Sequence, residues 1–182
     1  MPKPSDPKYR EAIFQAAYDL FLQHGYDGTS TAAIAKRARA STSHPFRFFK
    51  DKETMLEAVV RRIYDENHAL IRDFIKSGSD FSTDEFVDRG FDALAEMRQR
   101  ALFILHCTLT PKLTGRISEI FKEYNLGITD MFAPYLTHLP REDIEWIGDL
   151  LVSVSDTYFL DGDLERAKNA AKKLLDTVKN KA

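Results

Sequence analysis

Helical spacing of apolar residues is the feature that most constrains the fold of this 182-residue chain. Between residues 13 and 21, apolar side chains recur every three or four positions, which places them on one face of a helix. The same spacing marks 56–74, 144–158 and 164–178, and no segment shows the strict alternation of a half-buried strand. We therefore predict an all-α chain of roughly nine helices: three in a small head, one long connector and five in a body.

Capping residues and helix breakers predict where these helices begin and end. Gly25 follows the first apolar stripe and predicts the end of the first helix. Asp51 is expected to cap the long connector, and Ser82 with Glu85 matches a capping box. A separate apolar helix is predicted over 98–109.

Composition limits the class of protein. A chain that is 43% hydrophobic and 30% charged is typical of globular rather than disordered proteins. Its apolar runs are too short and too interrupted by charge to cross a membrane, and residues 1–10 lack the apolar core of a secretory signal. The one cysteine, Cys107, excludes an internal disulfide and fits a reducing compartment, so we expect a cytoplasmic protein.

The charge of the chain is unevenly distributed. The overall net charge is −2, yet residues 1–60 carry a net charge of +2 and residues 31–52 a net charge of +5. Because salt screens exposed charges beyond about 8–10 Å, the local charge decides whether phosphate is attracted. The charged residues of 31–52 are Lys36, Arg37, Arg39, Arg47, Lys50 and Lys52, against Asp51 alone. The basic head is therefore a candidate nucleic-acid-binding region.

Two short helices in this basic region form a predicted helix-turn-helix. Thr29 or Ser30 is expected to cap the first of them and Ser41 the second, with a tight turn between them at Arg39-Ala40-Ser41. In such motifs the second of these helices enters the major groove and presents polar side chains to base edges. The side chains expected there are Thr42, Ser43, His44 and Arg47.

Three stretches of the head lie in one register with a known family pattern. They are REAIFQAAYDLFLQHGYDGTS over 10–30, IAKRARAS over 34–41 and PFRFFKDKETML over 45–56. In their order of Arg, Ile, Ala-Ala, Leu-Phe, Gly-Tyr, Thr-Ser, Ile-Ala and Lys-Glu, they resemble the TetR (tetracycline-repressor-like) family of transcriptional regulators. The resemblance covers about residues 9–60.

This resemblance implies a set of residue roles. Backbone phosphate would be contacted by Thr29, Ser30 and Thr31 at the start of the second helix, and by Lys52 at the start of the fourth. Arg39 would add positive charge near the phosphates. The positions that would read bases and phosphate are Thr42, Ser43, His44 and Arg47.

The resemblance also implies two domains with different functions. Residues 1–50 would form the DNA-binding domain, and 51–182 would form a helical domain for ligand binding and dimerisation. A homodimer would form through the last two helices, over about 141–160 and 163–179. The implied partners are palindromic operator DNA and a small-molecule effector that releases it, which describes a repressor; activation is also compatible with the sequence.

Two departures from the family pattern fall in the helix-turn-helix. Arg39 stands where glycine is usual, at a turn position that requires a left-handed backbone and costs another residue about 1 kcal/mol. Pro45 stands where leucine is usual, and proline fits only the first turn of a helix. We therefore predict that the third helix starts late, near Ser43 or His44, and is short, with His44 pushed away from helical angles.

Two aromatic positions also differ from the pattern. Phe46 and Phe48 stand where tyrosines are usual, so two hydroxyl contacts to phosphate are absent. Together with Arg39 and Pro45, these changes keep an alternative open. In this alternative, the chain is a ligand- or partner-binding dimer of the same fold with weak or lost operator binding.

The body contains aromatic and soft side chains that could line a mostly apolar ligand cavity with few polar anchors. The candidates are Phe103, His106, Cys107, Met131, Tyr135 and Trp146. The competing interpretation is that each of them is ordinary packing, with Cys107 a small buried hydrophobe.

Sequence patterns of enzymes are missing from the chain. It has no phosphate-binding glycine loop, no dinucleotide fingerprint and no His-Glu-x-x-His. Its five histidines lack the spacing of metal ligands. His106 and Cys107 are adjacent, and neighbours on a helix point apart, so they form no local catalytic pair. We therefore predict a protein that is not an enzyme and has no cofactor or metal.

Overall fold

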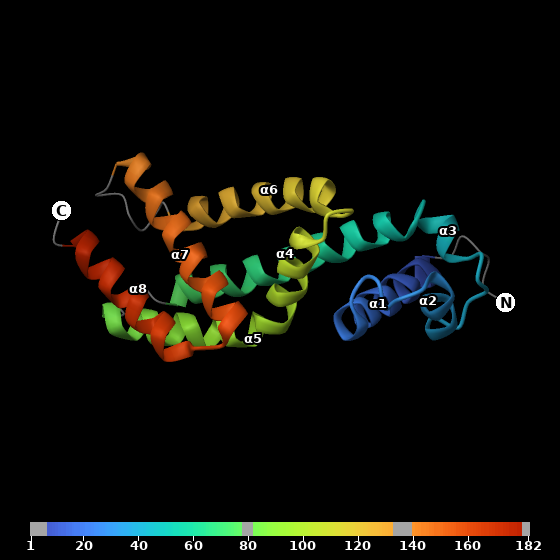
Figure 1. Cartoon of the computed structure of the whole chain (residues 1–182), viewed down its shortest axis with the longest axis horizontal. Coiled ribbons are helices and arrows are strands. Elements are labelled where there is room, and N and C mark those ends of the chain that lie inside the picture. The colour runs from blue at the N-terminus through green and yellow to red at the C-terminus, as the bar shows by residue number, and fades with distance from the viewer. Residues whose placement is uncertain (1–6, 78–81, 133–139, 180–182) are drawn as a thin grey trace. The chain divides into compact units, whose positions relative to one another are not determined.

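The fold is a set of helices joined by short connections, seen in a computed structural model that describes residues 7–77, 82–132 and 140–179 (Figure 1). The helices are α1 (Pro7–His24), α2 (Thr31–Arg37), α3 (Pro45–Phe48), α4 (Lys52–Ser77), α5 (Thr83–Leu109), α6 (Thr114–Phe132), α7 (Arg141–Asp161) and α8 (Leu164–Lys179). The described residues contain no strand, which confirms the all-α prediction. No helix among them is long and apolar enough to cross a membrane.

The described residues form eight helices where roughly nine were predicted, because α5 is continuous. The helix expected over 98–109 is the C-terminal part of α5, which runs for 27 residues from Thr83. The only breaker inside this helix is Gly90. A single interior glycine costs a helix about 1 kcal/mol, which the packing of a long apolar stripe can offset.

Local capping signals are confirmed at three helix ends. The Oγ of Ser82 accepts a hydrogen bond from the backbone N–H of Glu85, whose carboxylate accepts one from the N–H of Ser82 in return. Asp51 Oδ1 accepts the N–H of Thr54 at 2.7 Å and so caps α4. Gly25, with φ of 72°, ends α1 in the left-handed conformation. Each of these contacts joins residues close in sequence, which is why the sequence predicts them.

The chain forms two compact units that differ from a simple division into head and body. Unit 1 contains the described part of residues 1–63 together with 103–120, and unit 2 contains the described part of the remainder. The C-terminal part of α5 and the start of α6 therefore belong with the helix-turn-helix. The functional division between residues 1–50 and 51–182 stays a prediction.

Aromatic packing joins the end of α5 to the first helix within unit 1. The rings of Phe21 and Phe103 stack with centroids 6.4 Å apart, and both residues are buried. Cys107, one turn further along α5, is 0% exposed. Buried side chains of α6 extend the same unit, among them Ile117. The head therefore draws part of its core from a segment far along the chain.

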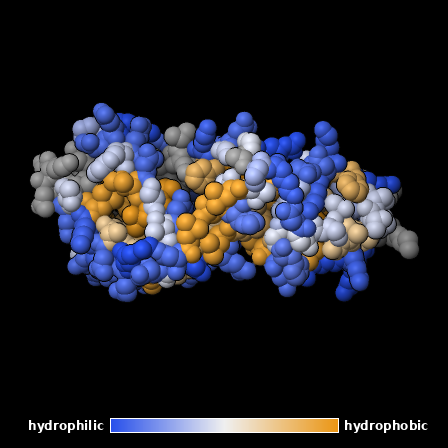
Figure 2. Space-filling view, in the orientation of Figure 1, coloured by the Kyte–Doolittle hydropathy of each residue, from blue (hydrophilic) through white to orange (hydrophobic). Residues whose placement is uncertain are grey.

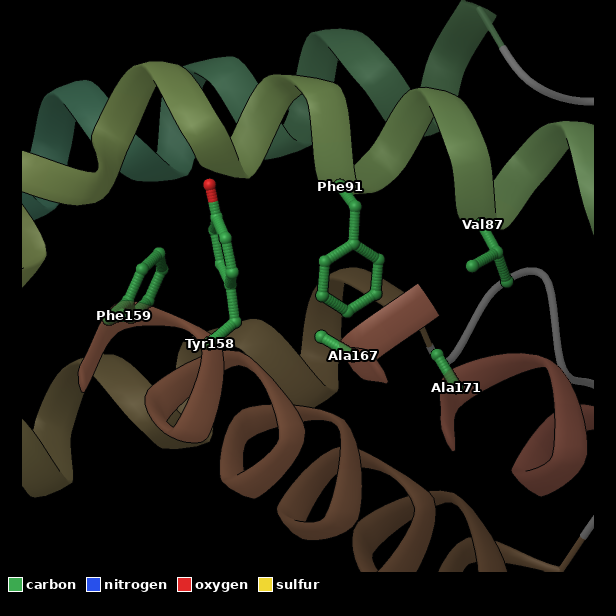
Figure 3. Close-up of a cluster of buried hydrophobic side chains, with 6 residues drawn as sticks. All are labelled: Val87, Phe91, Tyr158, Phe159, Ala167 and Ala171. Atoms are coloured by element: carbon green, nitrogen blue, oxygen red, sulfur yellow. The ribbon is translucent and has the colours of Figure 1, made fainter. Parts of the chain in front are cut away.

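Unit 2 has its own apolar cluster, formed by α5, α7 and α8 (Figure 3). The buried members are Val87, Phe91, Tyr158, Phe159, Ala167 and Ala171. Small alanines on α8 leave room for the rings of the other two helices, and Gly162 at φ of 74° makes the turn from α7 to α8. Ion pairs between α8 and α5, such as Lys168 with Asp92 at 3.1 Å, border this cluster.

Replacing Phe103 tests whether it is core packing. Phe103→Ala is expected to lower the free energy of unfolding by about 3–5 kcal/mol, because a buried ring in contact with Phe21 is removed and a cavity remains. Urea unfolding followed by circular dichroism measures the change. Leu105→Ala, at a half-buried position of the same helix, is the matched control and is expected to cost less. A loss below about 1 kcal/mol for Phe103→Ala would instead indicate a loosely packed side chain.

Candidate nucleic-acid interface

The connection between α1 and α2 gives its two hydroxyl residues different roles. Ser30 is the N-cap of α2, and its Oγ accepts a hydrogen bond from the N–H of Ala33 at 3.1 Å. Thr29 is only 2% exposed, and its hydroxyl lies 3.0 Å from the carbonyl oxygen of Leu20 and 2.8 Å from that of Gly25.

This arrangement concerns the expected phosphate contact of Thr29, which stays a prediction. The expected partner of Thr29 was the phosphate backbone, whereas in this structure its hydroxyl donates its one hydrogen to the carbonyl of Leu20 or of Gly25. A buried hydroxyl that donates to a carbonyl is stabilising, because its hydrogen is not left without an acceptor away from water. Ser30 is exposed and Thr31 is half-exposed, and the phosphate contacts expected of these two residues stay a prediction.

The turn after α2 depends on the backbone of Arg39. Its φ of 54° is the only positive value among the described residues other than glycine. The N–H of Ala40 bonds to the carbonyl of Ala35 at 2.9 Å, and the N–H of Arg39 to that of Lys36 at 3.1 Å. These two bonds define a Schellman ending, whose left-handed position is usually glycine. The strain predicted at Arg39 is therefore present, with an exposed cationic side chain at the strained residue.

The helix expected to enter the major groove is short and begins late, as predicted. Helix α3 spans four residues, with Pro45 at its first position and His44 as its N-cap. Ser41 does not cap it; the carbonyl of Ser41 accepts the N–H of His44 within the preceding turn. The backbone of His44 is helical, at φ −64° and ψ −40°, so the prediction that Pro45 would push it away from these angles is wrong.

Contacts of the His44 side chain explain this conformation. The imidazole stacks on Tyr9 of α1 with ring centroids 5.4 Å apart. Its Nδ1 accepts the backbone N–H of Ser41 at 3.3 Å and also contacts the Ser41 hydroxyl. These contacts fix the turn and offset the mild preference for extended angles before proline. In a neutral imidazole whose Nδ1 is an acceptor, the hydrogen lies on Nε2.

The surface of α2, the turn and α3 is polar and cationic. Residues 28–50 contain no acid. Within the described residues, Arg37 is paired with Asp19 at 2.7 Å, so its charge is partly neutralised. The exposed cations that have no ion pair within the described residues are Lys36, Arg39, Arg47 and Lys50, and Thr42 and Ser43 are exposed beside them.

The predicted phosphate clamp, Lys52, lies in an aromatic and charged cluster. Its ammonium is 4.0 Å from the centroid of the Tyr26 ring, and burial lowers its pKa. The ammonium of Lys112 is 5.2 Å from the same centroid and is paired with Asp27. The Tyr26 hydroxyl donates to Glu53 at 2.5 Å, and burial together with this bond raises the pKa of Tyr26.

Sequence reasoning missed Lys112, which stands 85 residues after its partner Asp27. No local pattern connects a residue between α5 and α6 with the turn after α1. Arg116 of α6 makes a second such contact, with Glu57 of α4 at 2.8 Å. Charged side chains from a distant part of the chain therefore lie beside the start of α4.

The residues predicted to line a ligand cavity are distributed over both units of the chain, and the cavity stays a prediction. Phe103, His106 and Cys107 belong to unit 1, where the first and last are buried and His106 is exposed. Trp146 belongs to unit 2 and is 46% exposed on α7. The Met131 side chain and Tyr135 lie outside the described residues. These placements favour packing for Phe103 and Cys107 over a role in binding ligand.

Metal ligands and a reactive thiol are also not found in the described residues. No group of three or more His, Cys, Asp or Glu side chains among residues 7–77, 82–132 and 140–179 could hold a metal ion. Burial raises the pKa of the Cys107 thiol to about 12, so it is protonated at neutral pH.

Taken together, the two short helices, the Schellman turn and the basic surface define a helix-turn-helix protein with a helical body. Residues 13–59 match the sequence model of the family described as bacterial regulatory proteins, tetR family. The N-terminal part of the chain therefore resembles the TetR family. This family consists of regulatory proteins, in keeping with the prediction that the chain is not an enzyme.

Individual relatives support the same assignment. The HTH-type transcriptional regulator YvkB of Bacillus subtilis (strain 168) is 25% identical over 154 residues, which cover 81% of this chain and 79% of that protein. The HTH-type transcriptional regulator RutR of Escherichia coli (strain K12) is 39% identical over 56 residues, covering 31% of this chain and 26% of RutR.

Solved structures share the fold over almost the whole chain. A transcriptional regulator from Rhodococcus sp. Rha1 has a TM-score of 0.70 at 18% identity, covering 100% of this chain and 98% of its own. The multidrug binding protein EbrR, complexed with imidazole, has a TM-score of 0.70 at 17% identity, covering 93% of this chain and 96% of its own.

Thr29→Val tests the buried role of the hydroxyl. The substitution keeps the side-chain shape and removes the donor, so the free energy of unfolding is expected to fall by about 1 kcal/mol. Affinity for DNA, measured on the folded protein, is expected to stay unchanged because Thr29 is 2% exposed. Thr31→Val is the control at a half-exposed hydroxyl. Weaker DNA binding by Thr29→Val at unchanged stability would instead support a contact between Thr29 and phosphate.

Arg39→Gly tests the strain in the turn. Glycine adopts the left-handed backbone freely, so the free energy of unfolding is expected to rise by about 0.5–1 kcal/mol. Arg39→Lys keeps both the charge and the strain and serves as the control in the same thermal or urea unfolding series. Equal stability of all three proteins would show that the Schellman bonds already offset the strain.

Proposed function

We propose that this protein is a transcriptional repressor that binds palindromic operator DNA as a homodimer and releases it when a small-molecule effector binds. The observation that carries the DNA-binding part is the surface of residues 28–50. On a helix-turn-helix frame, it has no acid and four exposed cations that form no ion pair with the part of the chain that the structure describes. Operator DNA in a bacterium lies in the cytoplasm, which is the location expected for the protein.

The contacts divide by chemistry. Hydroxyls and cations bind the phosphates of DNA whatever its base sequence. We assign this role to Ser30, Thr31 and Arg39. Base edges are assigned to the residues at and before α3, which are Thr42, Ser43, His44 and Arg47. The Nε2–H of His44 is a donor suited to purine N7 or carbonyl acceptors in the major groove. Lys52 can join the phosphate contacts only if its ammonium leaves the face of Tyr26.

Exposed apolar side chains on α7 support the dimer. Trp146 is 46% exposed and Leu160 is 61% exposed, and the two lie about four helical turns apart, on nearly the same face. Figure 2 shows apolar side chains at the surface of the part that holds α7 and α8. A second copy that covered this face through about 141–160 and 163–179 would bury them, and two-fold symmetry would require a palindromic site.

Effector binding rests on similarity to relatives. EbrR, which shares the fold, is a multidrug binding protein complexed with imidazole. By linkage, an effector that relieves repression must bind the DNA-free state more tightly, and effector and operator must weaken each other's affinity by the same factor.

One observation favours the alternative of a dimer with weak operator binding. Helix α3 has four residues, so it offers a shorter surface to the major groove than a helix of two or three turns would. Under that alternative, binding to DNA is weak and independent of sequence, while the dimer and its ligand site persist.

Selection of bound fragments from the source genome, followed by titration at several salt concentrations, tests the function. We expect a palindromic site bound at least about a thousand-fold more tightly than random DNA, with affinity falling steeply as salt rises. Arg47→Ala is expected to lose about 10–100-fold in affinity for that site. Lys122→Ala, an exposed cation of α6 in unit 2, is the control and is expected to have no effect.

Two outcomes would contradict the proposal in different ways. Weak binding of all fragments alike would favour the alternative of a ligand- or partner-binding dimer. Tight operator binding by a monomer, shown by sedimentation, would keep the DNA-binding function and remove the dimer.

A further inference from the structure

Phe46 is an exposed aromatic side chain on the short helix α3. It is 51% exposed, whereas Pro45 at the start of the same helix and Phe49 at its C-cap are buried. Among the described residues the other large apolar side chains with comparable exposure are Leu109, Trp146 and Leu160, and none of these belongs to the helix-turn-helix. Water therefore covers about half of the Phe46 ring at the surface of the helix-turn-helix.

The backbone fixes the direction of this ring. Pro45 and Phe49 anchor α3 to the core, and the N–H of Phe49 bonds to the carbonyl of Pro45 at 2.9 Å. Phe46 and Arg47 follow Pro45 by about 100° and 200° around the helix, which turns both away from that anchored side. The exposure of both residues agrees with this placement.

The surroundings of Phe46 specify the kind of partner. Arg47, Lys50 and Arg39 are exposed cations nearby in sequence, and no acid occurs between residues 28 and 50. Figure 2 shows mainly hydrophilic surface over the part that holds α1 to α3, with small apolar areas within it. An apolar ring framed by cations suits a polyanion that also offers apolar groups, and duplex DNA offers one such group in the major groove, the 5-methyl of thymine.

We propose that Phe46 reads thymine, through apolar contact of its ring with the 5-methyl group in the major groove. This inference rests on the proposed function, since it requires that α3 faces base edges. Phenylalanine has no hydroxyl to donate to phosphate, so its exposed ring contributes by covering apolar surface. Thymine is the only one of the four standard bases with a methyl group there, so the contact selects for A·T pairs in one orientation.

Deoxyuridine provides a direct test, because it pairs like thymine and lacks only the 5-methyl group. In the selected operator each thymine is replaced in turn by deoxyuridine, and the dissociation constant is measured at fixed salt. The wild-type protein is expected to lose about four-fold in affinity for each methyl group that Phe46 covers, the value of one buried methyl-sized group. The loss should be confined to one position, or two adjacent positions, in each half-site.

Variants assign the effect to Phe46. Phe46→Ala is expected to bind the thymine and deoxyuridine operators equally, while Phe46→Tyr, which keeps the ring, should still discriminate. Leu109→Ala is the matched control, because Leu109 is 71% exposed in the same unit but outside the helix-turn-helix, and it should discriminate as the wild type does. Since Phe46 is half exposed, Phe46→Ala should keep the wild-type unfolding transition, and Phe46→Leu provides a second, larger apolar replacement.

Three other results would contradict either the thymine contact or the proposed operator function. Equal binding of thymine and deoxyuridine operators by the wild type at every position would refute the contact. Discrimination that persists in Phe46→Ala would assign it to another residue and also refute the contact. Absence of any sequence-selective binding would instead overturn the proposed operator function, and the inference with it.

Discussion

The stacking of Phe103 on Phe21 is the contact on which unit 1 depends. A segment of about 50 residues buries too little apolar surface to be more than marginally stable. Here the end of α5 adds Phe103 and Cys107 to the core of the head, and the start of α6 adds Ile117. The helix-turn-helix is therefore stable as part of a larger unit, and its geometry is tied to residues of the body.

Charged contacts repeat this arrangement on the surface of the same unit. Lys112 pairs with Asp27 and lies over Tyr26, next to Lys52. The start of α4, where a phosphate contact is expected, thus shares its electrostatic environment with the connection between α5 and α6. Exposed ion pairs contribute at most about 1 kcal/mol each to stability, so their main effect is to orient side chains rather than to hold the fold together.

Much of the fold could be predicted from the sequence, because its determinants are local. The capping box at Ser82 and the Asp51 cap join residues three apart, and the left-handed turn at Arg39 and the late start at Pro45 follow from backbone sterics. The side-chain positions that could not be predicted depend on tertiary contacts. The burial of Thr29, the packing of Phe103 and the exposure of Trp146 involve neighbours that no spacing rule supplies. The helical backbone of His44 was mispredicted because side-chain contacts outweighed a local preference.

The burial of Cys107 has a consequence for how the motions of the protein can be followed. It is the only thiol in the chain, it is 0% exposed, and its pKa is raised to about 12. A thiol reagent can modify it only while the contact region between α1 and the end of α5 is transiently open, so the labelling rate reports how often this core opens. Labelling of this one thiol therefore measures local opening of the unit that contains the helix-turn-helix.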